Sequence, residues 1–268
     1  MSQRGYIAAR NVRRLLSVAI LALLTVSVTA GVNSLTVRMQ LVPAILSASV
    51  GWVIGWGAIT LAFGRVYCSL VCPLGTVQDG VAYVGRVLSK RPYRWHAPQD
   101  LLRLSVLWIV AGFSIMVPHL ALIIFDPYSI YFHCVVYVGT ALSATAVSVA
   151  LCATALGLAA WRGRLWCNTV CPVGTVLGML SRHAVYHPDI NTDLCINCRR
   201  CADVCKSCCI ELESHTIDTS RCVMCMNCTA VCPCGALTYR RGRHTLSWPL
   251  MKKTTQTPTA FARDADNK

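Results

Sequence analysis

Four long apolar stretches stand out from the polar parts of the chain. They cover residues 15–32, 41–63, 104–125 and 135–161, and none of them contains Asp, Glu, Lys or Arg. A helix that crosses the hydrocarbon core of a bilayer needs about 20 mostly apolar residues. The pattern therefore predicts four transmembrane helices. The composition agrees, because 55% of the residues are hydrophobic and only 13% are charged.

Lys and Arg gather on one side of these predicted spans. They precede the first span, fill the loop between the second and third, and follow the fourth, whereas the other two loops contain only Arg38. Basic loops stay in the cytoplasm, which predicts a multi-pass protein of the bacterial cytoplasmic (inner) membrane with both termini in the cytoplasm. A cleaved signal peptide ending near Ala30 is the alternative for the first span. The basic residues behind the net charge of +14 flank the predicted spans, so this charge indicates contact with membrane lipid and not with nucleic acid.

Residues 195–205 and 222–232 repeat the cysteine spacing Cys-x2-Cys-x2-Cys-x3-Cys. This is the bacterial ferredoxin spacing, in which the fourth cysteine of each run ligates the other cluster. We therefore expect two 4Fe–4S clusters, with zinc as the alternative; the reducing cytoplasm argues against disulfides. The expected ligands are Cys195, Cys198, Cys201 and Cys232 for the first cluster, and Cys222, Cys225, Cys228 and Cys205 for the second.

The first cysteine run departs from the ferredoxin pattern. Cys205 is followed by Lys206 instead of proline, and then by Cys208 and Cys209, either of which could replace Cys205 as a ligand. We favour Cys205, because Cys209 falls where ferredoxins usually carry a small apolar residue. Three further cysteines have no partner at ligand spacing and are expected to be small buried hydrophobic residues: Cys134, Cys152 and Cys234.

An internal repeat links the two halves of the apolar part. Residues 64–77 and 163–176 share the pattern Gly-Arg-x-x-Cys-x3-Cys-Pro-x-Gly-Thr-Val, and each copy follows two predicted spans. Pro73 and Pro172 suit the first turn of a helix. Two such copies predict a pseudo-twofold axis along the membrane normal. They would bring four cysteines together: Cys68, Cys72, Cys167 and Cys171.

Three interpretations of these four cysteines stay open. Convergent thiolates suit a soft metal, so they are candidate ligands of zinc or of a third iron–sulfur cluster. They could also be redox-active or docking thiols, since a helix N-terminus stabilises thiolate. The third interpretation is packing in a repeated turn.

The expected fold is a four-helix membrane domain of two pseudo-symmetric hairpins, followed by a small α+β ferredoxin-like domain. We place the first domain at residues 1–182, the second at residues 183–243, and a disordered tail at residues 244–268. The tail is expected because its composition is polar.

These motifs resemble the NapH/MauN-type membrane ferredoxins and the membrane part of the NosR family. The resemblance covers about residues 10–240 and includes Phe125-Asp126-Pro127-Tyr128-Ser129. It implies an electron-transfer subunit of a quinol dehydrogenase complex. The implied partners are quinone or menaquinol, and another oxidoreductase or ferredoxin-type subunit. No haem attachment motif occurs in the sequence, so the identity of the partner enzyme is open.

A quinone site could lie at either face of the membrane. At the outer end of the third span, the candidates are the ionisable and aromatic residues His119, Asp126, Tyr128, Tyr131 and His133. Such residues also commonly anchor a span to headgroups. The inner face, beside the Cys-x3-Cys-Pro loops, is equally open.

The leading hypothesis for function is a membrane-bound iron–sulfur protein that passes electrons between the quinone pool and a partner oxidoreductase. The alternative is a membrane ferredoxin that supplies electrons for maturation or reactivation of another metalloenzyme. A redox-sensing role is the third class, although no output domain is visible in the sequence.

Overall fold

The structure is a computed structural model that describes residues 3–31, 35–47, 49–90, 92–116, 126–136 and 142–241. His119 and the predicted tail lie outside these ranges. The elements of the N-terminal part are α1 (Gln3–Thr29), α2 (Leu35–Arg38), α3 (Leu41–Leu46), α4 (Val50–Phe63), α5 (Tyr67–Leu70), α6 (Pro73–Ser89), α7 (Asp100–Met116), α9 (Pro127–Val136), α10 (Leu142–Arg162), α11 (Leu165–Thr169) and α12 (Pro172–Ser181).

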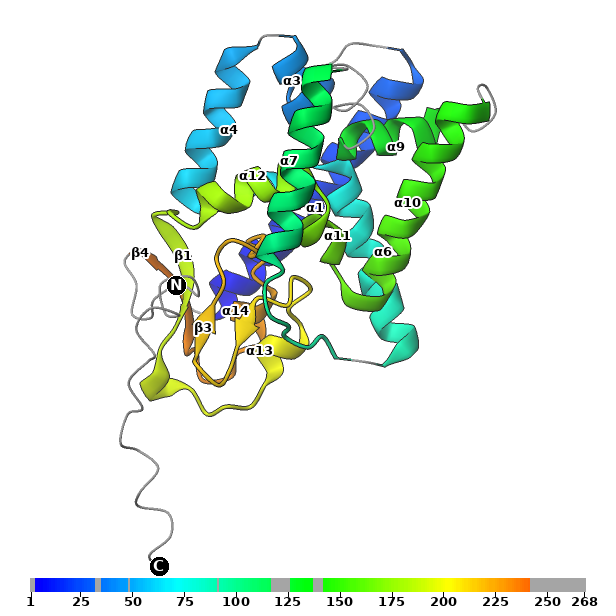
Figure 1. Cartoon of the computed structure of the whole chain (residues 1–268). Helices are drawn as coiled ribbons and strands as arrows, with labels where there is room; N and C mark the ends of the chain where they lie inside the picture. The colour runs from blue at the N-terminus through cyan, green and yellow to red at the C-terminus, as the bar shows by residue number, and fades with distance from the viewer. Residues whose placement is uncertain are drawn as a thin grey trace, which may run out of the picture.

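The long helices stand together at one end of the molecule (Figure 1). Among the described residues, α1 is the one helix that is long and apolar enough to cross a membrane. The second predicted span is divided, because α3 ends at Leu46 and α4 begins at Val50. The hydroxyls of Ser47 and Ser49 bond each other at the break (2.9 Å), and such side chains compete with helical backbone bonds. The four-span arrangement stays a prediction.

The cysteine-rich part forms the opposite end and contains two short antiparallel sheets (Figure 1). Its elements are β1 (Tyr186–Ile190), the 3₁₀ helix η1 (Thr192–Leu194), α13 (Arg200–Asp203), β2 (Ile210–Glu211), β3 (Thr216–Ile217), α14 (Asn227–Val231) and β4 (Leu237–Arg241). Strand β1 pairs with β4 and β2 with β3. Ile190, Ile210, Ile217 and Leu237 form a core with several cysteines. This mixture of short helices and strands agrees with the expected α+β architecture.

The two parts share a polar interface. The Ser181 hydroxyl at the end of α12 donates to the Thr219 carbonyl (2.9 Å), and the Tyr239 hydroxyl on β4 donates to the Phe63 carbonyl (2.9 Å). Residues close to both ends of the chain also meet, because the Tyr239 amide donates to the Tyr6 hydroxyl (3.0 Å). The cysteine-rich part is therefore docked on the helices and not tethered to them by a linker.

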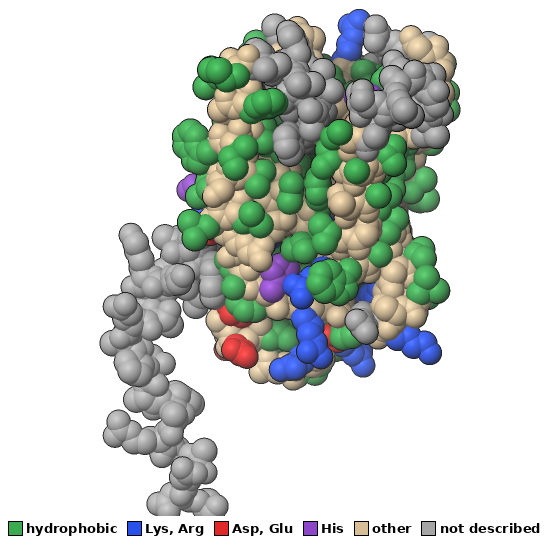
Figure 2. All heavy atoms as spheres, turned by 45° about the vertical axis from the view of Figure 1, so that its right-hand side comes forward, with side chains coloured by type: hydrophobic (Ala, Val, Ile, Leu, Met, Phe, Trp, Pro, Cys, Tyr) green, Lys and Arg blue, Asp and Glu red, His purple; other side chains and the backbone are tan. Residues whose placement is uncertain are grey.

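Large apolar side chains are exposed on the helical end. Figure 2 shows hydrophobic side chains over most of this end, whereas Lys, Arg, Asp and Glu gather mainly at the cysteine-rich end. Leu15 on α1 is 72% exposed, and Trp108 and Ile115 on α7 are each 75% exposed. Many exposed apolar side chains on one end of a protein mark contact with lipid or with another protein.

Candidate metal centres

The two ferredoxin-like cysteine loops have the same unusual backbone. Asn197 and Arg199 in the first loop, and Met224 and Met226 in the second, all have positive φ, between 51° and 62°. Non-glycine residues rarely adopt this conformation. Turns that alternate right- and left-handed residues point successive N–H groups into one concavity, which suits an anion. Both loops are therefore shaped to surround a negatively charged group.

The first loop encloses a cavity lined by cysteines. Four of its thiols are those expected to hold the first cluster, and the fifth is Cys234. The full set is Cys195, Cys198, Cys201, Cys232 and Cys234. Cys198 is exposed, whereas Cys201 and Cys232 are buried. One edge of this site therefore faces solvent.

The second loop encloses a similar cavity next to the first. Its cysteines are Cys205, Cys209, Cys222, Cys225 and Cys228. Cys205 arrives from the first cysteine run and Cys232 reaches the other cavity from the second run, so the runs exchange their fourth cysteines as the spacing predicts. Cys228 lies close enough to Cys201 for the charges of the two thiols to interact. The two cavities are thus neighbours, while the ligand assignment itself stays a prediction.

Each cavity has a fifth cysteine beside an expected ligand: Cys209, which the sequence offered as an alternative to Cys205, and Cys234. Cys209 Sγ lies 3.5 Å from Cys205 Sγ, and Cys234 Sγ lies 3.7 Å from Cys232 Sγ. Cys234 is predicted from the sequence to be a small buried residue, but it is half-buried and lines the first cavity. Cys134 and Cys152 are also half-buried and contact each other. The contact with Cys209 lowers the pKa of Cys205, which agrees with Cys205 as the thiolate of the pair.

The repeated Cys-x3-Cys-Pro loops also share one backbone. Cys72 and Cys171 are the N-caps of α6 and α12, and a proline occupies the first turn of each helix, as predicted. Gly64 and Gly163, which open the two copies, have φ of 78° and 69°. Only glycine adopts this conformation without strain, so these residues turn the chain out of α4 and α10.

The arginines of the two repeats cross over to the opposite copy. Arg65 donates to the Cys167 carbonyl (3.0 Å) and to the Asn168 side chain (2.7 Å). Arg164 donates to the Cys68 carbonyl in return. Both arginines are fully buried. The two copies therefore hold each other at the cysteines themselves.

A single carboxylate, Asp79 on α6, neutralises part of this positive charge. It pairs with Arg164 (2.7 Å) and with Lys206. Burial alone would raise the pKa of Asp79, but the two cations outweigh burial and hold it far below its usual range. Asp79 is therefore ionised at all ordinary pH values.

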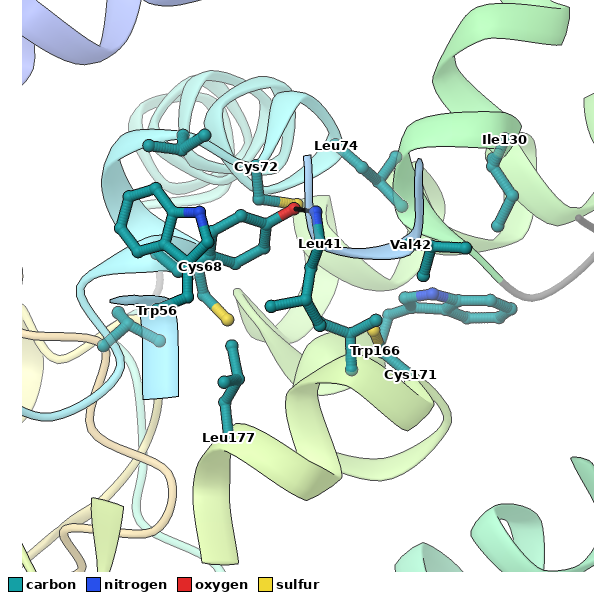
Figure 3. Packing of buried hydrophobic residues seen from close by; sticks show 14 of the residues in the cluster. Leu41, Val42, Trp56, Cys68, Cys72, Leu74, Ile130, Trp166, Cys171 and Leu177 are labelled. Atoms are coloured by element: carbon teal, nitrogen blue, oxygen red, sulfur yellow. Dashed lines mark hydrogen bonds between the residues drawn. The ribbon is translucent and has the colours of Figure 1, made fainter. Parts of the chain in front are cut away.

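The four repeat cysteines gather in one buried region. Figure 3 shows Cys68, Cys72 and Cys171 among the apolar side chains of a core that includes Leu41 and Leu177. Cys167 lies beside them, close enough for electrostatic interaction with Cys68 and Cys171. Burial raises the pKa of Cys167 to about 11. Within the described ranges, no three His, Cys, Asp or Glu residues meet closely enough to hold one metal ion.

The outer-face residues considered for quinone have structural partners. The Asp126 carboxylate accepts from the backbone N–H and the hydroxyl of Ser129 (3.1 Å each) and so begins α9. The Tyr131 hydroxyl bonds Thr25 on α1 (2.7 Å). His133 Nδ1 lies 2.9 Å from the Ser129 carbonyl oxygen. These contacts favour a structural role over a quinone site at this face.

An open cavity of about 530 Å³, named here the inner cavity, lies between α1, α6 and the cysteine-rich part. Its lining combines two tyrosines with a group of cations and one carboxylate, and it includes Arg13, Asp79, Gly80, Tyr83, Tyr93 and Lys206. Arg13 and Lys206 interact electrostatically with Cys225. This cavity therefore borders the second cysteine site.

Comparison with known proteins supports the iron–sulfur assignment. A family model described as "4Fe-4S binding domain" matches residues 45–92 and 144–189, and a second model with the same description matches residues 215–238. Iron–sulfur clusters of the 4Fe–4S type are therefore the cofactors of this chain. No solved structure is significantly similar to it.

The curated proteins that are similar to this chain align with only part of it. Escherichia coli (strain K12) YccM, named for electron transport, is 27% identical over 62% of this chain and 48% of its own length. The methylamine utilization ferredoxin-type protein MauN of Paracoccus denitrificans is 28% identical over 59% and 58%, and MauN of Methylobacillus flagellatus is 29% identical over 59% and 54%. The chain spans about half the length of the curated relatives it matches.

Proposed function

We propose that the chain is a membrane-anchored, ferredoxin-type electron carrier that exchanges electrons between the quinone pool and a partner oxidoreductase. The observation that carries this proposal is the pair of cysteine cavities. Each is enclosed by a loop with two left-handed residues, and each receives one cysteine from the other run. Such sites suit two neighbouring 4Fe–4S clusters. When bound, each cluster accepts and donates one electron at a time.

The electron-transport role is supported by the relatives. YccM and MauN are named for electron transport and as ferredoxin-type proteins, respectively. Besides the cysteine sites, the described residues contain no phosphate-binding loop motif and no nucleophile–base pair of a hydrolase. We therefore propose an electron-transfer subunit of a quinol dehydrogenase complex, as in the NapH-type proteins that it resembles, and not an enzyme acting alone.

The membrane association is supported by α1 and by the exposed apolar surface. The apolar part of α1 is mostly exposed, as expected for a helix that faces lipid. Arginines occupy the N-terminal end of α1, and Arg14 among them donates to the Asn227 side chain of the cysteine-rich part (3.1 Å). Basic residues beside a span favour the cytoplasm, which supports a cytoplasmic position for the cysteine-rich part.

The inner cavity is the best-supported place for a quinone ring. It opens beside the exposed side chain of Val18 on α1, which would give access from lipid. Tyr83 and Tyr93 offer aromatic faces, and Arg13 and Lys206 offer donors to ring oxygens. Oxidation of a quinol releases two electrons and two protons. The two cluster sites match the electrons, and the open cavity lets the protons leave to water.

The partner would dock near the first cysteine cavity. Cys198 is exposed there, and the neighbouring Ile196 and Leu194 are 66% and 51% exposed. Exposed apolar side chains at the edge of a redox site are typical of a docking surface.

The test is anaerobic purification from membranes, followed by iron analysis, low-temperature EPR and addition of a menaquinol analogue. We expect at least about eight irons per chain and reduction of the clusters by the quinol. Zinc in place of iron would overturn the cluster assignment. Intact clusters that no quinol reduces would contradict the quinol-oxidising role and would favour electron supply to quinone or to enzyme assembly.

Two leucine variants test the cavity. A Cβ at Gly80 or at Gly112 meets no atom within 4 Å, so neither substitution begins with a backbone clash. Gly80 lines the cavity and Gly112 does not. Gly80→Leu should slow quinol-dependent reduction at least tenfold, whereas Gly112→Leu should leave the rate unchanged. Equal rates in both variants would place the quinone elsewhere.

A further inference from the structure

We propose that Cys68, Cys72, Cys167 and Cys171 together hold one further 4Fe–4S cluster, shared between the two repeats. This site adds to the two-cluster carrier proposed above and does not require that quinol is the donor. It is a cofactor site inside the helical part, where two copies of a motif each contribute half of the ligands.

The number of cysteines requires sharing. Each of the two matched segments, residues 45–92 and 144–189, contains only one Cys-x3-Cys pair. A 4Fe–4S cluster is normally held by four thiolates, so neither copy can bind one alone. The structure brings the two pairs into one buried region, where all four cysteines interact electrostatically.

The charge around the four thiols points to an anion. Arg65 is fully buried, and no described carboxylate pairs with it. Arg164 and Lys206 are also buried and share one carboxylate, Asp79. Three cations against one carboxylate leave a buried excess of positive charge, which is costly unless an anion compensates it. A cluster with four thiolate ligands carries the negative charge that is missing.

Two polar atoms at the site have no partner among the described residues. Arg65 Nε and Gln78 Nε2 are both buried without a hydrogen bond. The other end of the Gln78 amide faces Cys167, whose Sγ lies 3.0 Å from Gln78 Oε1. Rotation of this amide would let Nε2 donate to a Cys167 thiolate, and Arg65 Nη2 already lies 3.9 Å from Cys68 Sγ. Donors to sulfur are a usual means of tuning such a cluster.

The arrangement fits a cluster better than a single ion. Four thiols around zinc converge on one atom, whereas the corners of a cubane are further apart. The two ferredoxin-like cavities likewise contain no group of described residues that closes around one ion. The repeat cysteines therefore share this property with the sites already assigned to clusters.

The site is positioned to exchange electrons with the second ferredoxin-like cavity. Arg65 also donates to the Ser220 carbonyl (3.1 Å), just before Cys222. Val223 belongs to the same buried core as Cys68 and Cys72, and Cys225 packs against that core. The three sites thus form a contiguous series from the helical end to the exposed Cys198.

The test compares paired cysteine variants purified without oxygen. We expect about twelve irons in the parent chain, and about eight both in Cys68→Ala/Cys72→Ala and in Cys167→Ala/Cys171→Ala. The quadruple variant should lose no more iron than either pair, because one cluster is shared. Cys134→Ala removes a thiol of the helical part outside the four and should retain all of the iron.

The outcomes separate this proposal from the two-cluster carrier. Eight irons in the parent chain, unchanged in both paired variants, would overturn the shared cluster and leave the carrier intact. Stoichiometric zinc lost with either pair would also overturn it. The variant Cys222→Ala/Cys225→Ala should lose iron from the second ferredoxin-like cavity and should keep the EPR signal of the shared cluster. The remaining eight irons show that each repeat variant is folded.

Arg65 provides a second readout. The buried cation of Arg65 stabilises the reduced state of the cluster, which is the more negative one. Arg65→Gln removes this cation, so the midpoint potential of the shared cluster should fall. Arg65→Lys should restore most of the potential. The potentials of the two ferredoxin-like clusters should change less. A potential unchanged by Arg65→Gln, with all iron retained, would contradict a cluster at this site.

Discussion

The chain contains two duplicated units, the tandem cysteine runs and the Gly-Arg-x-x-Cys repeats. The two copies within each unit exchange a residue, and the kind of residue differs between the units. The tandem cysteine runs exchange a cysteine, since Cys205 and Cys232 each line the cavity of the other run. The Gly-Arg-x-x-Cys repeats exchange arginines, since Arg65 and Arg164 each bond the opposite copy. The copies of the first unit thus share two cavities, whereas those of the second are joined by hydrogen bonds from buried arginines.

This difference predicts which unit depends on iron for its structure. Buried ion pairs and hydrogen bonds order the repeats before any cluster binds, so their cysteines form a preorganised site. The ferredoxin-like part has two short sheets and a small core rich in cysteine. A small domain of this kind gains much of its stability from the bound group.

The largest expected effect is the loss of one ferredoxin-like cluster. Cys205→Ala should remove about four irons per chain, because the exchanged ligand is lost. Cys209→Ala, at the neighbouring thiol, should keep the iron and lose only the hydrogen bond to Cys205. Iron analysis and EPR measure both variants. The opposite result would make Cys209 the ligand.

The next effect comes from breaking the exchanged arginine pair. Arg164→Ala leaves Asp79 with Lys206 alone and removes bonds to the Cys68 and Gly75 carbonyls. Removing one partner of a buried pair costs about 3–5 kcal/mol. We expect this loss in the free energy of unfolding, measured in detergent. Arg162→Ala, at an exposed neighbour, should change the free energy of unfolding by less than about 0.5 kcal/mol. Similar losses in the two variants would show that the contacts of Arg164 with the opposite repeat do not stabilise the protein.

A smaller effect tests how closely each repeat is packed. A Cβ at Gly75 would clash with the Cys68 carbonyl, whereas a Cβ at Gly80 on the same helix meets nothing within 4 Å. Gly75→Ala should destabilise the protein by about 1–3 kcal/mol, because the obstacle is backbone. Gly80→Ala should be neutral or slightly stabilising. Thermal unfolding of the two variants is the direct comparison, and an equally neutral Gly75→Ala would refute the close approach.

The smallest effect in the ordinary pH range concerns Asp79. Its pKa in the folded chain is depressed, so the stability that it contributes is complete above its unfolded pKa of about 3.9 and is lost as pH falls through the folded pKa. Stability should therefore vary little on account of Asp79 between pH 7 and pH 5 and fall in stronger acid. Asp79→Asn should lower the stability at pH 7 and flatten this acid dependence. An unchanged acid profile in the variant would show that other groups cause it.

The cysteine spacing predicted which thiols would share each ferredoxin-like cavity, because three ligands on one tight loop fix the position of the fourth. The repeat predicted that Pro73 and Pro172 stand in the first turn of a helix, and both do, in α6 and α12. The sequence also offered Cys209 as an alternative to Cys205, but it did not indicate that Cys234 would line the first cavity. The position of Cys234 depends on the turn after Cys232, which carries no ligand signal. The break between α3 and α4 was missed for a similar reason, since hydropathy measures length and not continuity of a helix.

The exchange of arginines was also invisible in the sequence. Both residues stand beside predicted spans, where an arginine normally marks the cytoplasmic face. Only their buried contacts across the repeat show a second role. A charged residue repeated at the same place in two copies is the signal that could have indicated it.

The contact between the two ends of the described chain bears on the order in which the protein is made. Gln3 donates to the Cys232 carbonyl (3.1 Å), and Tyr6 accepts from Tyr239. Gln3 and Tyr6 are translated long before their partners, which follow 229 and 233 residues later in the chain. Both contacts can form only after the chain has been made as far as Tyr239. Docking of the cysteine-rich part on α1 is therefore a late step of folding.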